Sequence, residues 1–205
     1  MPDRPDSTAV PEAERAPRRL RADAARNIDA LLEAATAGFA ASAVDVPMRE
    51  IAARAGVGVG TLYRHFPKRS DLIQAVFRRE VDACFDAGES LAAQCRPVEA
   101  LTRWLLRFTD FVATKRGLAA ALHSGDPAYD ALPGYFTGRL GPTLQALLDS
   151  AAACGEIRSD ADAEELLTAV SRLCIPGPVD DGSEHSHRMV RLLVDGLRFG
   201  AARSR

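Results

Sequence analysis

Apolar side chains recur at spacings of three and four residues along most of this chain, and no other feature limits its possible folds as strongly. Such spacing places the apolar side chains on one face of an α-helix. One stripe consists of Ile28, Leu31, Leu32, Ala35 and Phe39. Strand-type alternation is absent over any useful length, and no internal repeat is visible. The sequence therefore predicts an all-α fold.

Glycine and proline divide the periodic sequence into separate helices. Helices are predicted over about residues 23–41, 48–55, 58–66, 69–93, 97–117, 118–123, 143–153, 160–174 and 183–200. Gly56 is expected to turn the chain in the left-handed conformation, and Asp160 and Ser183 to cap the last two helices. Residues 125–142, rich in glycine and proline, are expected to form a broken connection, with a lid or an entrance to a site as its hypothetical role.

The amino-terminal residues 1–20 carry many charges and prolines with few large apolar side chains, so a disordered arm is expected there. No apolar run has the length of a membrane-spanning helix, and the start of the chain lacks the apolar centre of a secretory signal. The expected location is the cytoplasm.

Cysteine and histidine spacing argues against a metal centre. No two cysteines form a C-x-x-C pair, so a zinc or disulfide framework is not expected and all four are interpreted as small buried hydrophobic residues. They are Cys84, Cys95, Cys154 and Cys174. His185 and His187 are the alternative metal ligands, but positions two apart do not share a helix face. No cofactor is expected.

The overall charge is close to neutral, but its distribution is uneven. Residues 1–80 hold 13 basic and 11 acidic side chains, whereas the rest of the chain is net acidic. Between Arg15 and Arg26 there are five arginines and a single acid, Asp23. Such a basic run is either a solvated tail or an electrostatic footprint for nucleic acid.

Residues 51–69 have the outline of a helix-turn-helix, because two short helical segments meet at a glycine corner. In the second helix Leu62 and Phe66 face the core, so the side chains between them project outward. Gly58 and Gly60 would let the start of this helix approach DNA closely, with its free N–H groups directed at a phosphate.

Ten residues are the candidate DNA contacts: Arg49, Gly58, Val59, Gly60, Thr61, Tyr63, Arg64, His65, Lys68 and Arg69. Thr61 offers a hydroxyl to phosphate and a methyl to thymine, and Arg64 suits a guanine edge or a phosphate. Two alternatives stay open: Tyr63 as a core aromatic with a solvated hydroxyl, and Arg64 as a solvated surface charge.

At A-G-V-G-V-G-T-L-Y-R-H-F-P, residues 55–67, the chain resembles the TetR family of bacterial regulators. The resemblance covers about residues 22–72. It implies a three-helix DNA-binding domain (21–68), followed by a helical ligand-binding and dimerisation domain (69–205) whose last two helices form the dimer interface. In the family, the positions of Gly58 to Thr61 approach DNA, those of Tyr63 and His65 hold its backbone, and Arg69 replaces a usual lysine. Val46, Pro47, Ala43 and Lys68 depart from the usual pattern.

The second half of the chain carries weaker signals. The candidate ligand-binding residues are Trp104, Phe108, Phe111, Leu122, His123 and Phe136. Apolar residues at helical spacing more often form core, and a lone histidine is usually satisfied locally. The candidate dimer residues are Leu166, Val170, Leu173, Met189, Leu193, Gly196, Leu197 and Gly200. Packing within their own domain is the alternative.

Together these features predict a homodimeric transcriptional repressor that leaves palindromic operator DNA when a small molecule binds. The ligand would favour a spacing of the two DNA-binding domains that no longer fits successive major grooves. The sign of regulation stays open. An enzyme with paired carboxylates is the first alternative, although Glu164–Glu165 and Asp180–Asp181 are adjacent and diverge. A helix-turn-helix used for protein contacts is the second.

Overall fold

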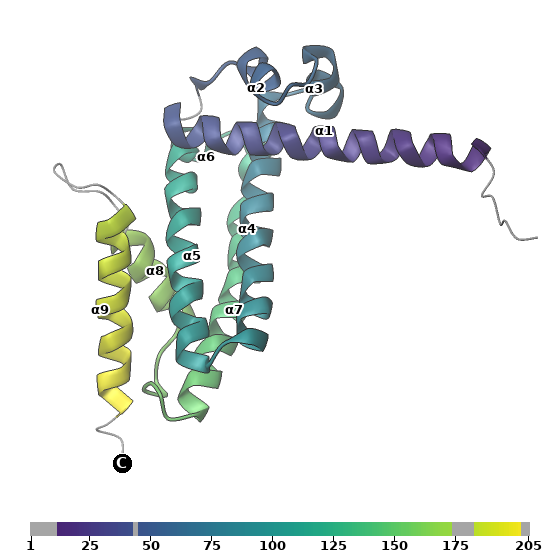
Figure 1. The fold of residues 1–205 in the computed structure, drawn as a ribbon. Coiled ribbons are helices and arrows are strands. Elements are labelled where there is room, and N and C mark those ends of the chain that lie inside the picture. Colours follow the sequence, from purple (N-terminus) through teal and green to yellow (C-terminus); the bar gives the residue numbers. More distant parts are fainter. Residues whose placement is uncertain (1–11, 43–44, 174–182, 202–205) are drawn as a thin grey trace, which may run out of the picture.

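The computed structural model describes residues 12–42, 45–173 and 183–201, and within these ranges it is helical without any strand, as predicted. The first three helices are α1 (Glu12–Ser42), α2 (Met48–Arg54) and α3 (Val59–His65). They lie across one end of the molecule, with α2 and α3 on the outer side of α1 (Figure 1). We call these three helices the head.

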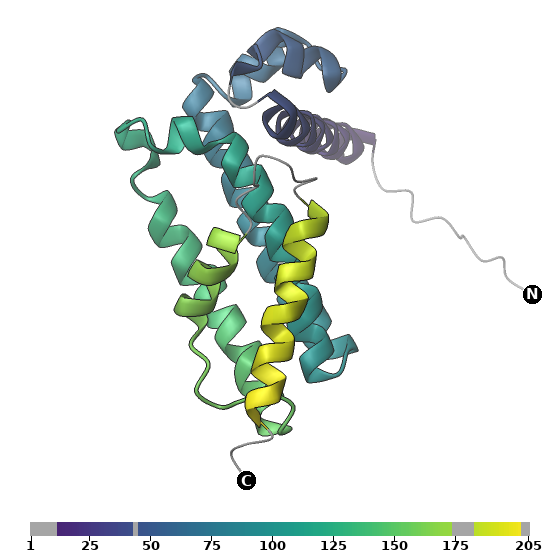
Figure 2. The same cartoon turned by 90° about the vertical axis from the view of Figure 1, so that its left-hand side faces the viewer.

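The remaining helices form a bundle, here called the body. Its long members α4 (Arg69–Gln94), α5 (Pro97–Gly117) and α7 (Leu132–Ala153) lie side by side, because each buries an apolar stripe against the others. The short α6 (Ala119–Leu122) and the 3₁₀ helix η2 (Pro127–Tyr129) connect α5 to α7. The last helices, α8 (Ala163–Leu173) and α9 (Ser183–Ala201), flank α5 and α7 (Figure 2). No helix of the described ranges combines the length and apolarity of a bilayer crossing.

The head is built around the predicted apolar stripe of α1. Leu31 and Phe39 are fully buried, together with Ile51 of α2 and Leu62 of α3. Gly56 has a φ of 65°, so the predicted left-handed corner between α2 and α3 is confirmed. This corner directs α3 so that Leu62 enters the core and the neighbouring side chains face outward.

Several contacts join the head to the body, among them a hydrogen bond from Arg79 Nη1 of α4 to the carbonyl oxygen of Asp29 in α1 at 3.0 Å. A Cβ added at Gly117, the last residue of α5, would lie 2.2 Å from the carbonyl oxygen of Phe39, so the backbones of α1 and α5 touch there. On the α4 side, Arg69 Nη2 donates a hydrogen bond to the carbonyl oxygen of Val46 at 2.8 Å, and its guanidinium lies 5.9 Å from the Phe39 ring centroid. Both α4 and α5 therefore contact the end of α1 or the residues that follow it.

The expected arm over residues 1–20 is wrong for residues 12–20, which are part of α1; residues 1–11 lie outside the described residues. Residues 12–16 (Glu-Ala-Glu-Arg-Ala) are strong helix formers, with acids near the positive end of the helix dipole. A shortage of apolar side chains does not prevent helix formation here, because the buried stripe from Leu31 onward anchors the same helix.

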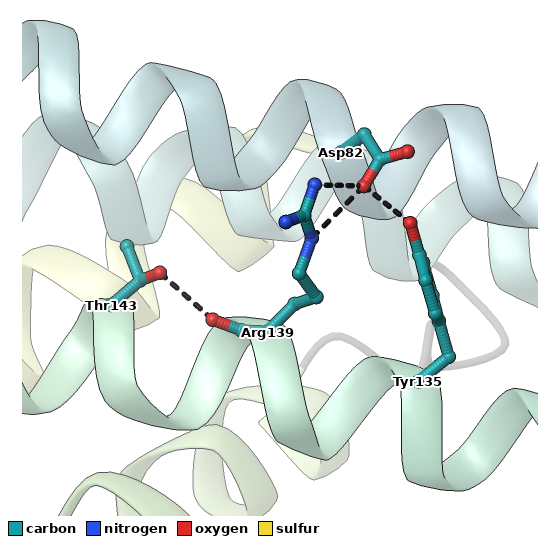
Figure 3. Close-up of polar contacts among 4 residues, drawn as sticks. All are labelled: Asp82, Tyr135, Arg139 and Thr143. Atoms are coloured by element: carbon teal, nitrogen blue, oxygen red, sulfur yellow. Dashed lines mark hydrogen bonds and ion pairs between the residues drawn. The ribbon is translucent and has the colours of Figure 1, made fainter.

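The broken connection expected over residues 125–142 is confirmed for residues 125–131 but wrong for residues 132–142, since α7 begins at Leu132. Pro133 lies in the first helical turn, where its missing N–H costs nothing. A polar contact with α4 then holds the glycine-rich part of α7 (Figure 3). Asp82 Oδ1 accepts hydrogen bonds from the Tyr135 hydroxyl at 2.6 Å and from Arg139 Nη2 at 2.6 Å and Nε at 3.0 Å. We call this the Asp82 contact; its hydrogen bond raises the pKa of Tyr135.

Two smaller expectations need correction. Asp162 rather than Asp160 caps α8, because its Oδ1 accepts a hydrogen bond from the Glu165 N–H at 2.8 Å, whereas Asp160 pairs with Arg158. Of the cysteines, only Cys84 is buried, while Cys95 is half-buried and Cys154 is exposed; all three are free thiols. Cys174 lies outside the described residues. Burial raises the pKa of Cys84 to about 12.

Candidate DNA-binding and ligand-binding sites

The outer face of α3 carries several predicted DNA-contact residues. Tyr63 is 49% exposed and Val59 is 42% exposed, although both are large side chains on a helix whose Leu62 is fully buried. Arg64 is exposed as well, while Thr61 and His65 are half-buried at the edges of this face. The alternative of Tyr63 as a core aromatic is therefore wrong, and its phenol is free to meet a partner.

The start of α3 has little side-chain bulk, because two of its first residues are glycines. Gly58 is the N-cap in an extended conformation, with no side chain capping the helix. A Cβ built on Gly60 would meet nothing within 4 Å, so packing within the described residues does not require a glycine there. The absence of side chains instead keeps the end of α3 open to a partner.

Two other predicted contacts lie beside α3. Arg49 is exposed on α2, next to the ion pair of Arg54 and Glu50 at 2.6 Å. Lys68 is the exposed N-cap of α4, and its backbone N–H donates to Asp71 Oδ2 at 2.8 Å. This hydrogen bond uses the backbone N–H of Lys68 and not its ammonium.

Arg69, predicted to bind phosphate, has a different position from the other candidates. Its guanidinium points into the head–body junction, toward Val46 and the Phe39 ring. These contacts hold α4 to the end of α1, and that Arg69 also binds phosphate stays a prediction. The sequence alone does not distinguish an arginine that binds phosphate from one that joins the head to the body, because in both cases it simply follows a helix that ends at a proline.

Three of the ligand candidates belong to the core of the body. Trp104, Phe108 and Phe111 are fully buried, with Trp104 and Phe108 stacked at 5.7 Å between ring centroids. Trp104 also donates from Nε1 to the carbonyl oxygen of Cys84 at 2.8 Å, which leaves this indole no unpaired polar atom. These residues form core in this structure, and their part in a ligand site stays a prediction.

The other three candidates do meet at a cavity. Leu122, His123 and Phe136 line a space of about 210 Å³ between α4, α5, η2 and the start of α7. Its remaining lining residues are Phe77, Lys115, Tyr129, Leu132, Pro133 and Thr137. We call it the junction cavity, because Tyr129 of η2 packs beside α4 close to the head. His123 Nδ1 lies 2.8 Å from the carbonyl oxygen of Ala119, which satisfies one ring nitrogen locally.

Sequence reasoning missed Lys115 on the wall of this cavity. Lys115 follows Phe108 and Phe111 at the same helical spacing, so it continues a buried apolar stripe with a cation. That interruption is the signal that could have drawn attention to it. Burial lowers the pKa of Lys115.

A second cavity, of about 310 Å³, lies at the end of the body away from the head, where α4 turns into α5. Its lining residues include Phe85, Gly88, Pro97, Pro142 and Ala146. We call it the distal cavity. Among the described residues, no three histidine, cysteine, aspartate or glutamate side chains gather as metal ligands in any part of the molecule.

The predicted dimer residues divide into two groups. Leu166 and Val170 of α8 are buried within the chain, which favours the alternative that they pack within their own domain. Gly196 is exposed, and the partly buried candidates are Leu173, Met189, Leu193 and Leu197; Gly200 lies in the last turn of α9. Two exposed apolar residues were missed: Leu192 is 63% exposed and Phe199 is 72% exposed.

Residues 31–76 match the family profile described as bacterial regulatory proteins, tetR family. Residues 96–199 match the profile of the transcriptional regulator SbtR-like C-terminal domain, which spans half of the chain. Curated relatives include an HTH-type transcriptional regulator of Staphylococcus aureus, 41% identical over 64 residues. This match covers 31% of the chain and only 35% of the relative's length.

Solved structures match over nearly their whole length. A TetR transcriptional regulator from Streptomyces coelicolor is 38% identical, with a TM-score of 0.70 over 83% of this chain and 98% of its own. A TetR transcription regulatory protein from Mycobacterium vanbaalenii is 37% identical, with a TM-score of 0.68 over 87% and 99%. A regulator from Saccharomonospora viridis in complex with choline, 21% identical, shares the fold alone (TM-score 0.64, over 82% and 95%).

These matches place the helix-turn-helix of α2 and α3, and the helical body, in a family of DNA-binding regulators that are not enzymes. The chain belongs to the TetR family of transcriptional regulators.

Proposed function

We propose that this regulator is a cytoplasmic repressor that holds a palindromic operator as a homodimer and releases it when a small molecule binds the body. The observation that carries the DNA-binding face is the exposure of Tyr63 and Arg64 on α3, together with exposed Lys68 at the N-cap of α4, the next helix. Phosphate contacts from such groups position a recognition helix, while Thr61 and Arg64 read base edges.

The outer face of α9 supports a two-fold dimer. Leu192 and Phe199 are two helical turns apart, and the exposed Gly196 lies between them on the same helix. No other helix of the described residues covers this side of α9 (Figure 2). A second copy packing there would bury both side chains and present two α3 helices, about 34 Å apart or a multiple of it, to successive major grooves.

The dimer proposal is tested by replacing both exposed residues with glutamate. Leu192→Glu with Phe199→Glu places charges in the proposed interface and leaves the buried residues of α9 untouched. We expect light scattering to give half the native mass, and operator affinity to fall. A native protein that is already monomeric, or a variant of unchanged mass, contradicts this interface.

The junction cavity supports the ligand response. Phe77 of α4 and Lys115 of α5 border the cavity, and the head–body contacts of Arg69 and Gly117 are made by the same two helices. A ligand that prefers one arrangement of these helices would shift the head by its difference in affinity for the two states. A regulator of this fold holds choline, which supports a small-molecule site in the body.

The test of operator binding is fluorescence anisotropy with duplex DNA from upstream of the protein's own gene, across a salt series. We expect native protein to prefer this DNA to a scrambled duplex. Affinity should fall steeply with salt, by a log–log slope of about −0.9 for each phosphate contact. The Tyr63→Ala, Arg64→Ala double variant should lose the preference. Arg103→Ala, at an exposed arginine of α5 far from α3, is the matched control.

Equal and weak binding of native protein to both duplexes, together with no palindrome in a genome-wide selection of bound fragments, would overturn the proposal. A helix-turn-helix used for protein contacts predicts that result. The sign of regulation is tested separately by transcription from the bound promoter, which repression lowers and activation raises.

A further inference from the structure

Lys115 is a half-buried cation on the wall of an otherwise largely apolar cavity. Its Nζ lies 5.2 Å from the centroid of the Phe136 ring, so within the described part of the chain the ammonium makes a cation–π contact with this ring. Phe136 is itself held by stacking on Phe111, with 5.5 Å between ring centroids. The ammonium therefore has a fixed aromatic neighbour but no anionic one.

No acidic side chain lines the junction cavity among the described residues. Asp126, in the loop before Tyr129, instead accepts a hydrogen bond from the Ala128 N–H at 2.9 Å. Desolvation alone lowers the pKa of Lys115, with no carboxylate to oppose it. A methionine would cover Phe136 without this cost, so a lysine at this position is unfavourable for the free protein and favourable for an anionic ligand.

The side chains that line the junction cavity also indicate the shape and polarity of the rest of the ligand. Phe77, Phe136 and Tyr129 present aromatic surface, and His123 adds one polar atom, because Ala119 occupies its Nδ1 and leaves Nε2. The volume of about 210 Å³ corresponds to roughly seven water molecules, which suits a ligand with a single ring.

We propose that the junction cavity binds a small aromatic carboxylate, with its ring between Phe77 and Phe136 and its carboxylate on Lys115. This assignment rests on the proposed function, since it names the ligand class for the site that controls operator release. Charge-assisted hydrogen bonds to an ammonium are short and strong in such a setting, so the charge of the ligand should dominate recognition.

The experiment is calorimetric titration of the full-length protein without DNA, with phenylacetate and its neutral amide, phenylacetamide. We expect native protein to bind phenylacetate at least about tenfold more tightly than the amide. Lys115→Met should bind the two compounds equally, and its unfolding temperature without ligand should be equal to or above that of native protein. Ala146→Phe, which fills the distal cavity, is the control and should keep the native preference.

The proposal is overturned if native protein binds neither compound at millimolar concentration, if it shows no preference for the carboxylate, or if Lys115→Met keeps that preference. Loss of binding in Ala146→Phe alone would transfer the site to the distal cavity and also overturn it. The proposed function is judged separately by anisotropy. Phenylacetate that binds through Lys115 and leaves operator affinity unchanged supports the site but contradicts ligand release through it.

Discussion

The head and the body of this regulator both carry candidate functional residues, but the head exposes them and the body buries most of them. In α3, Tyr63 and Arg64 are exposed, although packing would favour burial of the tyrosine. In α5, Trp104 and Phe108 are fully buried and stacked on each other. A functional surface shows itself where residue types depart from what packing requires. An apolar ligand site and a core use the same residue types, so in the body this signal is weak and rests on Lys115, a cation that interrupts an apolar stripe.

The largest expected effect separates core from surface. Trp104→Ala removes a buried ring and its hydrogen bond to Cys84, so the free energy of unfolding should fall by about 3–5 kcal/mol. Tyr63→Ala should change it by less than about 0.5 kcal/mol and lower operator affinity. Chemical denaturation measures both. A comparable loss of stability in the two variants would break the distinction between the head and the body.

A smaller effect is expected at the head–body junction. Gly117→Ala would place a Cβ 2.2 Å from the Phe39 carbonyl oxygen, and a backbone atom cannot move aside as a flexible side chain does. We expect a loss of about 1–3 kcal/mol in unfolding free energy and altered operator affinity. Gly134→Ala, with nothing within 4 Å of its Cβ position, is the control. Equal stability of the two variants would mean that α1 and α5 can move apart at this junction without a loss of unfolding free energy.

At Gly60 stability and function should change in opposite directions. Alanine has open space there in the free protein and is the better helix former, so Gly60→Ala should raise the unfolding free energy by about 0.5–1 kcal/mol. The added methyl group should lower operator affinity if α3 approaches DNA as closely as proposed. Anisotropy beside thermal unfolding measures the two effects, and unchanged affinity would place this end of α3 away from DNA.

The smallest effect is expected at the Asp82 contact between α4 and α7. Asp82→Asn weakens its hydrogen bonds to Tyr135 and Arg139, but all three side chains are partly exposed and solvent replaces much of what is lost. The unfolding temperature should fall less than in Gly117→Ala. In Asp82→Asn the raised pKa of Tyr135 should return toward its ordinary value, which absorbance titration of the tyrosines would follow. An unmoved titration would mean that Asp82 does not hold the phenol.

Much of the fold was predictable because helical spacing and chain breaks are local properties. The stripe from Ile28 to Phe39, the left-handed Gly56 and the end of α5 at Gly117 all follow from neighbouring residues. The predictions were wrong where contacts between residues far apart in the sequence determine the local structure. Residues 132–142 look broken locally, but α7 begins at Leu132 and buries Leu132 and Leu140 where it packs against α4 and α5.

The candidate sites divide in the same way. The sequence by itself determined the all-α class, the helix-turn-helix and the side of α3 that faces outward, because periodicity and a long ordered motif specify them. Only the tertiary structure decided that Arg69 binds Val46 and that Leu166 is buried while Phe199 is exposed. It alone brought Lys115 of α5 beside Phe136 of α7. The physical reason is that partners far apart in the chain meet only through packing, and burial depends on those partners.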